Sequence, residues 1–397
     1  MSNANVKLDE VVTLYDSLHK TPPGYKDEGY PMIRVTDIRR GFVDTNGTKR
    51  VDYETFREFS KKHRPTVGDI LFTRVGSYGN SCFVNRDEEI CLGQNTVCIT
   101  PAQKRLDPYY LYCCLNSEVV SAQIESFVGG ASQPTISLRN IKEIEIPLPD
   151  LPTQRKIAGI LSAYDDLIEN NLRRIKILEQ MAQSLYREWF VHFRFPGHES
   201  ATFKGSELGR IPEGWEVKKL GELADQMRRG VSKGKLDEVT RYVGLEHIPR
   251  QSLALDAWEE VIELGSNKLL FERGDVLFGK IRPYFHKVVV APFDGVCSAD
   301  TIIIRAKKPD HRALVTFCVF TEAFVAHATA TSNGSKMPRT DWKVLKDYPL
   351  VLPPKDLLAR FSTLSETAID QQQNLVKRNQ TLRHSRDLIL PKLLNQK

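Results

Sequence analysis

The stretch Val67-Gly68-Asp69-Ile70-Leu71-Phe72 recurs as Arg273-Gly274-Asp275-Val276-Leu277-Phe278, at an offset of 206 residues. Further segments repeat in the same order at offsets of 204 and near 212. These are Gly130–Pro134 with Gly334–Pro338, Ile146-Pro147-Leu148-Pro149 with Leu350-Val351-Leu352-Pro353, and Lys7–Val11 with Lys219–Leu223. Several matches in one order at nearly one offset indicate an internal duplication. The sequence therefore predicts two copies of one globular block.

A long periodic segment follows the first block, from Leu151 onward. Its apolar residues recur at alternating steps of four and three, which is the pattern of a coiled-coil seam. The predicted seam is Ile157, Leu161, Tyr164, Ile168, Asn171, Ile175, Leu178, Ala182, Leu185 and Trp189. We expect the polar Asn171 to fix the helix register by requiring a polar partner. The seam spans 33 residues, or about 50 Å of helix.

The C-terminal segment repeats this periodic design. Its predicted seam is Leu357, Phe361, Leu364, Ala368, Leu375, Leu382 and Ile389, interrupted by Gln371, Arg378 and Ser385. Pro391 is expected to terminate the helix. A long amphipathic helix needs a packing partner. The two helices are predicted to pair with each other, and packing of each on its own block remains the alternative.

The sequence thus predicts an α/β (α+β) fold with two tandem β-rich domains, two long antiparallel coiled-coil helices and a pseudo-two-fold internal repeat. The predicted boundaries are 1–150 for the first domain, 151–195 for a central spacer helix, 196–214 for a linker, 215–352 for the second domain and 353–397 for a C-terminal spacer helix. Strands are expected at Asp69–Phe72, Thr96–Thr100, Val276–Phe278, Lys287–Val290 and Thr301–Arg305. One helix is expected in each domain, at Pro108–Ser126 and at Asp310–Ala328.

The composition is that of a globular protein, with 41% apolar and 27% charged residues. The sequence shows no apolar run of the roughly 18 to 20 residues that a membrane span requires, and no leader, so a cytoplasmic protein is expected. The seven cysteines lack CxxC spacing, which favours reduced thiols and no metal site. The net charge of +6 weakly favours an anionic partner. Clusters of Lys and Arg near Gly and Ser within the two blocks favour contact with phosphates.

Several segments carry a family resemblance. The strongest are Ile146–Ala158, Ser184–Val191 and Gly214-Trp215-Glu216, and Ser132–Ile136 with its second copy Lys336–Arg339 adds to them. Over its whole length the chain resembles the specificity subunit of Type I restriction-modification systems. The resemblance implies two target-recognition domains, each reading one half of a split site on double-stranded DNA. It also implies helices that dock modification (methyltransferase) subunits, expected to be two, and restriction/translocase subunits in the full complex.

DNA recognition requires side chains that reach base edges, with Arg or Lys on guanine and Asn or Gln on adenine, while phosphate contacts set position. The candidates in the first domain are Arg74, Ser77, Tyr78, Asn80, Gln133 and Thr135. Those in the second domain are Lys280, Arg282, Tyr284, His286, Lys287, Asn333, Lys336 and Arg339. Each could instead be an ordinary loop residue, and Tyr78 and Tyr284 could be core residues. Because the two loops differ, the half-sites are expected to differ in sequence.

The motifs of the expected partner enzymes are absent from the sequence. It has no Pro-Pro-Tyr loop for a flipped adenine and no Gly-rich cofactor turn; Asp107-Pro108-Tyr109-Tyr110 is the nearest approach. It has neither a nuclease-like carboxylate cluster nor a phosphate-binding loop. We therefore expect a non-catalytic chain that binds no cofactor, with S-adenosylmethionine, ATP and Mg used by partner subunits. The alternatives are an orphan DNA-binding protein that recruits another effector, and a coiled-coil tether.

Overall fold

The structure, a computed structural model, describes residues 5–129 and 134–394. The chain divides into two compact units. Unit 1 comprises Met1–Glu169 and Thr381–Lys397, and unit 2 comprises Asn170–Gln380. Each unit thus contains one β-rich domain together with a segment of each long helix.

Unit 1 is built around a four-stranded antiparallel sheet with the order β2-β8-β5-β6. These strands are β2 (Val12–Asp16), β8 (Thr96–Pro101), β5 (Ile70–Thr73) and β6 (Ser81–Phe83). The smaller sheets are β4 (Arg50–Val51), β3 (Tyr30–Ile33) and β7 (Cys91–Leu92), and the pair β1 (Asn5–Lys7) and β9 (Glu145–Pro147). The helices of this domain are α1 (Tyr53–Phe59), α2 (Pro108–Leu115), α3 (Glu118–Phe127) and α4 (Leu138–Lys142).

Unit 2 repeats this plan with the antiparallel order β13-β21-β18-β19. These strands are β13 (Ala224–Met227), β21 (Thr301–Ala306), β18 (Val276–Gly279) and β19 (Val288–Val290). The second sheet has five strands: β14 (Gly230–Val231), β17 (Lys268–Phe271), β20 (Gly295–Ser298), β15 (Gly234–Val243) and β16 (Glu259–Leu264). β12 (Glu216–Lys219) pairs with β22 (Pro349–Leu352), and the helices are α6 (Leu220–Leu223), α7 (Arg312–Val319), α8 (Glu322–Ala330) and α9 (Trp342–Leu345).

The predicted duplication is confirmed by the shared strand order, and all five predicted strands are present. Each predicted helix, however, is two helices, because Ser117 and Thr321 each begin a new one. Their hydroxyl groups accept hydrogen bonds from the backbone N–H of Val120 and Phe324 respectively, as N-caps do. The segment predicted as a linker contains the hairpin β10 (Phe203–Ser206) and β11 (Gly209–Pro212).

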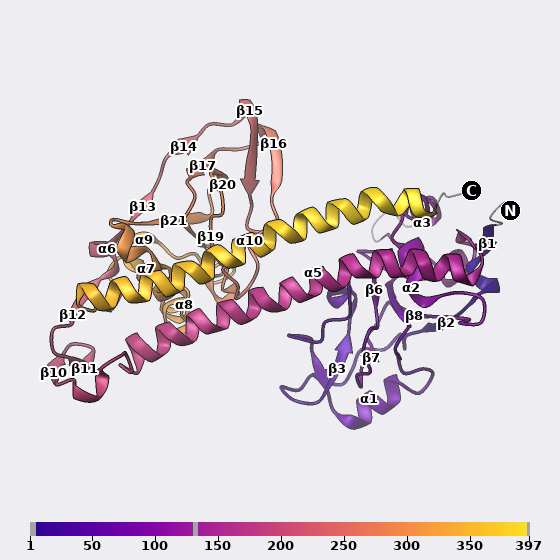
Figure 1. The fold of residues 1–397 in the computed structure, drawn as a ribbon, viewed down its shortest axis with the longest axis horizontal. Coiled ribbons are helices and arrows are strands. Elements are labelled where there is room, and N and C mark those ends of the chain that lie inside the picture. The colour runs from indigo at the N-terminus through magenta and orange to yellow at the C-terminus, as the bar shows by residue number, and fades with distance from the viewer. Residues whose placement is uncertain (1–4, 130–133, 395–397) are drawn as a thin grey trace. The chain divides into compact units, whose positions relative to one another are not determined.

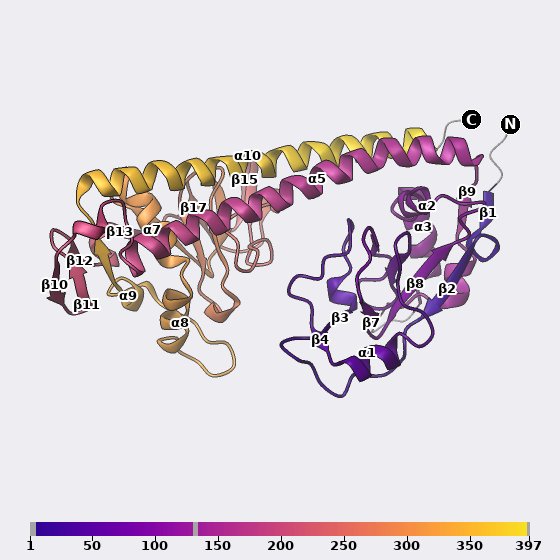
Figure 2. The same ribbon diagram turned by 60° about the horizontal axis from the view of Figure 1, so that its bottom comes forward.

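The two spacer helices are α5 (Leu151–Tyr186) and α10 (Lys355–Leu394). α5 is followed by a wider helical turn at Arg187–Val191, so helical structure ends four residues before the predicted boundary. In each unit, segments of α5 and α10 lie side by side (Figure 1, Figure 2). They run antiparallel in both units. In unit 1 Asp165 pairs with Arg386 while Ile157 and Leu161 pack with Leu390 and Leu394, and in unit 2 Asn171 pairs with Asn379 while Tyr186 and Trp189 contact Phe361. The Asn171 Nδ2 donates to the Asn379 Oδ1 at 2.8 Å, which is the polar partner predicted for Asn171.

The predicted seam of α5 is buried or half-buried, but that of α10 needs correction. Leu364 is 54% exposed, and the residue that is buried there is Ser365. Four buried polar residues repeat every seven positions along α10, namely Ser365, Gln372, Asn379 and Arg386. The predicted seam consists of two sets of positions, each repeating every seven residues. The set that includes Leu364 is therefore shifted by one residue, because the buried positions of that set are mostly polar and give no apolar signal.

The long helices supply core residues to both domains. In unit 1, Ile157 and Leu161 of α5 pack with Leu390 and Leu394 of α10. In unit 2, Phe361 of α10 packs with Tyr186, Trp189 and Phe190. Pro391 does not terminate α10 as predicted, since the helix continues to Leu394. Burial of Leu390 and Leu394 on either side of Pro391 provides the reason.

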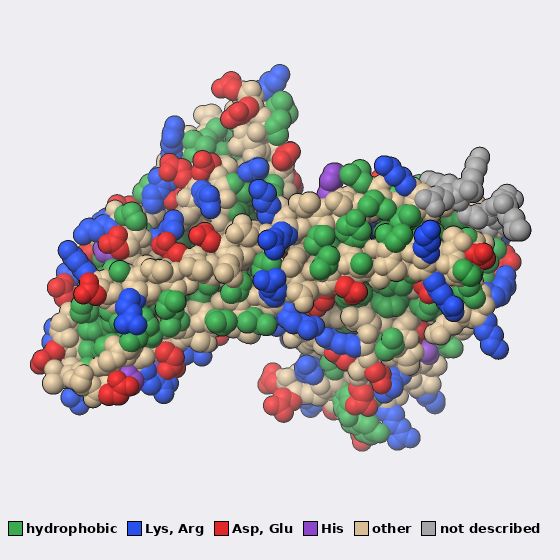
Figure 3. All heavy atoms as spheres, in the orientation of Figure 1, with side chains coloured by type: hydrophobic (Ala, Val, Ile, Leu, Met, Phe, Trp, Pro, Cys, Tyr) green, Lys and Arg blue, Asp and Glu red, His purple; other side chains and the backbone are tan. Residues whose placement is uncertain are grey.

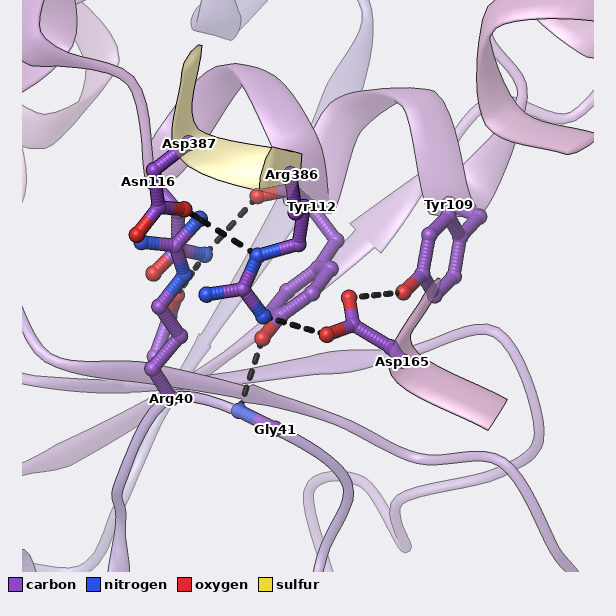
Figure 4. Close-up of polar contacts among 9 residues, drawn as sticks. Arg40, Gly41, Tyr109, Tyr112, Asn116, Asp165, Arg386 and Asp387 are labelled. Atoms are coloured by element: carbon purple, nitrogen blue, oxygen red, sulfur yellow. Dashed lines mark hydrogen bonds and ion pairs between the residues drawn. The ribbon is translucent and has the colours of Figure 1, made fainter. Parts of the chain in front are cut away.

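A buried polar network joins the helices of unit 1 to the domain (Figure 4). The Arg386 guanidinium forms an ion pair with Asp165, whose other oxygen accepts a hydrogen bond from the Tyr109 hydroxyl. Arg386 Nε also donates to Asp387 at 3.1 Å, and Arg40 forms an ion pair with Asp387 at 2.8 Å. The network fixes the end of α10 against α5 and α2.

Among the residues that the structure describes, no single helix is long and apolar enough to cross a membrane. One bent pair, Pro309–Val319 with Glu322–Ala330, meets that criterion only when joined across a 68° bend.

Candidate nucleic-acid interface

The predicted recognition residues of unit 2 lie on two segments that are fastened together. The loop after β18 pairs with the hairpin at Asn333–Arg339 through an Ile281–Arg339 bridge. The Arg282 N–H donates to the Pro338 carbonyl at 2.7 Å, and the Thr340 N–H donates to the Lys280 carbonyl at 3.0 Å. The structure thus brings together the two segments that the sequence named separately.

Unit 1 has the same arrangement in its described residues. A Val75–Thr135 bridge joins the loop after β5 to the segment that precedes α4. The Gly76 N–H donates to the Pro134 carbonyl at 3.1 Å, and the Ile136 N–H donates to the Arg74 carbonyl at 3.0 Å. These contacts recur in unit 2 at offsets of 204 to 206 residues. The paired loops are therefore part of the duplicated fold.

The exposed members of this set in unit 2 are Tyr284, Asn333, Lys336 and Arg339, with Arg282 half-buried beside them. Tyr284 is 51% exposed, so it is not a core residue. Lys280 is held at the base of the loop, where its Nζ donates to the Ala299 carbonyl at 2.8 Å. The exposed side chains combine positive charge, an amide and an aromatic ring, which are the groups that contact phosphates and base edges.

Two predicted residues of the same loop face inward. The Nε2–H of His286 donates to the Phe320 carbonyl at 2.9 Å, and burial lowers the pKa of the imidazole. The Lys287 Nζ donates to the Leu245 carbonyl, and burial also lowers the pKa of this ammonium group. Both side chains use their polar groups to hold the loop in place. They are therefore not directed outward, as side chains that contact bases would be.

In unit 1 the exposed candidates are Ser77 and Asn80. The Arg74 guanidinium is held by the Asp16 carboxylate at 2.9 and 3.0 Å, and its Nε donates to the Ile136 carbonyl at 3.2 Å. Tyr78 packs against the core of unit 1. Thr135 is half-buried in the bridge to Val75. Gln133 lies outside the described residues.

Arg250, which the sequence did not single out, lies next to the loop after β18 (Lys280–Lys287), which we call the recognition loop of unit 2. Its guanidinium carbon is 4.1 Å from the centroid of the Phe285 ring. Residue 250 also forms an antiparallel bridge with Lys287. The adjacent polar pair Arg250-Gln251 after Pro249 was the available signal, but nothing in its spacing relates it to a loop some thirty residues later.

Two clusters of described residues could hold a metal ion by proximity, His63 with Asp69 and Cys98, and Glu246 with His247 and Glu259. The Asp69 carboxylate already accepts hydrogen bonds from Thr66 and Thr100 and contacts His63 at 2.7 Å. Burial raises the pKa of the Cys98 thiol well above its ordinary value. A neutral thiol is a poor metal ligand. We therefore interpret Asp69 as a structural residue that stabilises the turn before β5, and not as a metal ligand.

Apolar side chains are also exposed on the long helices in each unit (Figure 3). These residues, which we call the helix surface of each unit, are Ile160, Leu167 and Leu388 in unit 1, and Leu172, Ile177, Met181 and Leu364 in unit 2. They remain exposed although the seam beside them is buried. Exposed apolar side chains on a helix are candidates for contact with a partner protein.

With this geometry established, comparison with known proteins identifies the family. The sequence matches the family described as "Type I restriction modification DNA specificity domain" over residues 3–180 and 212–376. The chain belongs to this specificity family. Each match contains one β-rich domain and much of the long helix that follows it, so the family domain occurs twice, as the internal repeat predicts.

Individual specificity subunits show the same relation. The chain is 25% identical over 298 residues to the type I restriction enzyme MjaIX specificity subunit of Methanocaldococcus jannaschii, covering 72% of this chain and 68% of that one. It is 27% identical over 283 residues to the EcoDI specificity subunit of Escherichia coli, covering 66% and 62%. The crystal structure of the S subunit from M. genitalium shares the fold, with a TM-score of 0.56 at 15% identity over 99% and 96% of the two chains.

Proposed function

We propose that this chain is the DNA-recognition subunit of a type I restriction-modification complex and carries out no catalysis itself. The observation that supports this most directly is the repeated pair of loops. Each unit joins the same two segments by equivalent hydrogen bonds, yet presents different side chains on them. Two copies of one scaffold with different surface groups suit the reading of two different half-sites.

In this proposal the two units divide the site between them. Ser77 and Asn80 contribute to one half-site, and Arg282, Tyr284, Asn333, Lys336 and Arg339 contribute to the other. The amide of Asn80 can bond adenine through two hydrogen bonds, and the fork of Arg282 matches guanine. Lysine side chains such as Lys336 suit phosphate contacts, which position the protein without selecting sequence.

The helix surface is the proposed docking site for partner subunits. We infer that modification subunits, two in the complex, bind along α5 and α10, and that restriction/translocase subunits join the full complex. The partners supply S-adenosylmethionine, ATP and Mg chemistry, and the complex acts on DNA in the cytoplasm. The apolar side chains exposed on the helices in both units support more than one docking position.

The test is methylome sequencing of cells that express this chain with its modification subunit, against cells that lack only this chain. A split, asymmetric methyladenine motif should be present only with the chain. Replacing Arg282 by Ala should relax the sequence requirement in one half of that motif and leave the other half unchanged. A motif that persists without the chain, or no motif in either strain, would contradict the proposal.

A further inference from the structure

Strained backbone is concentrated at one place in unit 2. Five described residues other than glycine have a left-handed backbone with positive φ, namely Asn95, Phe193, Gln251, Arg282 and His286. Three of the five, at φ of 50° to 53°, belong to the recognition loop or the segment beside it. Side chains avoid this conformation, so it persists only where surrounding contacts enforce it, and it gathers at functional sites.

The contacts that enforce it join residues 250 and 251 to the recognition loop. The Gln251 N–H donates to the His286 carbonyl at 2.9 Å. The His286 N–H donates to the Pro283 carbonyl at 2.8 Å, and the Phe285 N–H donates to the Arg282 carbonyl at 2.9 Å. Residues 250 and 251 are thus a third segment of the recognition surface, held as firmly as the two that the sequence predicted.

Two arginines share one aromatic ring on this surface. The guanidinium carbon of Arg250 lies 4.1 Å from the Phe285 ring centroid, and that of Arg282 lies 6.0 Å from it. The exposed Tyr284 ring packs edge-on against Phe285 at 4.9 Å. Within the part of the chain that the structure describes, neither arginine forms an ion pair with a carboxylate, whereas Arg74 and Arg305 do.

This arrangement calls for an acceptor outside the chain. The position of the Arg250 guanidinium over the Phe285 ring restricts this side chain, so less side-chain freedom is lost when its fork binds an acceptor pair. A phosphate contact needs only positive charge, for which a mobile lysine suffices. A planar guanidinium fork matches a planar pair of acceptors, and guanine offers such a pair, N7 and O6, in the major groove.

We propose that Arg250 and Arg282, braced on Phe285, contact guanine in the half-site read by unit 2, so that Arg250 is a specificity-determining residue. This inference rests on the proposed function. It applies to unit 2 alone, because at the offset of 206 residues the positions of Arg282 and Phe285 are Gly76 and Gly79 in unit 1. Unit 1 therefore has no equivalent of the braced guanidinium pair at these positions.

The experiment uses the complex of the chain with its modification subunits and duplexes that carry its methylation motif. Each guanine of the second half-site is replaced in turn by 7-deazaguanine, which keeps base pairing but lacks the N7 acceptor. We expect wild type to lose affinity by about 5- to 100-fold at one guanine or more. Arg250→Ala should bind the motif more weakly and become insensitive to the replacement at one such guanine.

Arg250→Lys keeps the charge and can still donate to guanine, but it lacks the planar fork. It should therefore bind the motif more weakly than wild type but more tightly than Arg250→Ala, whereas a pure phosphate contact predicts binding equal to wild type. The matched control is Arg241→Ala, because Arg241 also lies over a ring of unit 2, that of Phe293 at 4.8 Å, away from the recognition loop. The control should keep the wild-type pattern of sensitivity.

Two results would overturn the inference. One is wild-type binding that no 7-deazaguanine in the second half-site weakens. The other is an Arg250→Ala variant that keeps every sensitivity of wild type while losing affinity for all sequences alike, as loss of a phosphate contact would produce. Either result leaves the proposed function standing as long as the wild-type complex prefers its motif over unrelated DNA. Failure of that preference would instead refute the proposed function.

Discussion

At the scale of single residues, Glu179 of α5 couples the spacer helix to the segment that carries Arg250. Its side chain is only 6% exposed, and its carboxylate accepts a hydrogen bond from the Leu253 N–H. Burial raises the pKa of this carboxyl from 4.5 to about 7. The folded chain therefore binds more protons than the unfolded chain between about pH 4.5 and 7, and the contribution of Glu179 to stability falls as pH rises through this window.

Replacement of Glu179 by Gln should remove the free-energy cost of burying an ionised carboxylate, while keeping an oxygen that accepts the hydrogen bond from the Leu253 N–H. We expect Glu179→Gln to stabilise the chain at pH 8 by on the order of 2–3 kcal/mol. The difference should shrink toward zero near pH 4.5. Urea unfolding at several pH values measures this, with the exposed Glu238→Gln as control. A difference that stays constant with pH would rule out titration of Glu179 as its cause.

A second residue-scale prediction concerns the buried pair Arg386–Asp165. Arg386→Met would leave the Asp165 carboxylate buried, with the Tyr109 hydroxyl as its remaining partner in the network of Figure 4. We expect a loss of about 3–5 kcal/mol, because an uncompensated charge remains in the interior. Replacing both members, as Arg386→Met with Asp165→Leu, should recover most of the loss.

Denaturant unfolding of the single and double variants decides this prediction. Lys142→Met is the control, since it breaks the exposed Lys142–Asp9 pair at 2.8 Å and should change the transition little. If the double variant were as unstable as the single one, the loss would come from packing and not from the isolated charge.

The sequence nominated the two loops that pair in each unit, but not the direction of each side chain. Arg74 is held by Asp16, which lies 58 positions away along the chain. His286 is held by the carbonyl of Phe320, 34 positions away. Local pattern carries no information about such partners. Residue type can therefore suggest which side chains contact bases. Tertiary contacts decide whether each of these side chains is free to do so.

At the scale of elements, helix periodicity predicted α5 and α10 and their pairing. The error in α10 has a physical cause, since its buried row includes Ser365, Gln372, Asn379 and Arg386. A search for apolar residues at heptad spacing selects Leu364, one position earlier. Asn379 and Arg386 can fix the register, because a shifted register would bury them without their partners Asn171 and Asp165. The buried polar residues that specify how the helices pair are thus the reason why the apolar pattern gave the wrong seam positions.

The exposed helix surface yields an element-scale prediction. Leu172 of α5 is 38% exposed, and Leu172→Glu places a charge on the proposed docking site. We expect loss of co-purification with the modification subunit, because a buried unpaired charge is costly at an interface. Leu208→Glu is the control, since Leu208 is 43% exposed but lies in the turn of the β10–β11 hairpin.

Co-purification of tagged variants with the modification subunit measures this effect. Unchanged recovery with Leu172→Glu would exclude this part of α5 from the docking site. Loss of recovery with both variants would point to a general effect of added charge.

At the scale of the whole molecule, the repeat predicted two domains, but the compact units do not follow the order of the sequence. Residues from 381 onward belong with the first domain, although they were predicted as part of a helix that follows the second. The reason lies in the cores, because Leu390 and Leu394 pack in unit 1 while Phe361 of the same helix packs in unit 2. Periodicity identifies a helix but not the cores that each part of it enters.

Division of the molecule into two units predicts independent reading of the half-sites. Asn80→Ala in unit 1 and Arg282→Ala in unit 2 should each weaken binding to the motif by about 1–3 kcal/mol. Their effects should add within about 0.5 kcal/mol in the double variant, because residues without shared partners act independently.

Arg282→Ala combined with Arg339→Ala is the positive control for coupling. These two residues lie on segments joined by the Ile281–Arg339 bridge and the Arg282–Pro338 hydrogen bond. Binding of the purified complexes of wild type, each single variant and the double variant to one duplex that carries the motif supplies the four affinities of each cycle. Coupling between Asn80 and Arg282 as large as that of the control would mean that the two half-sites are read as one.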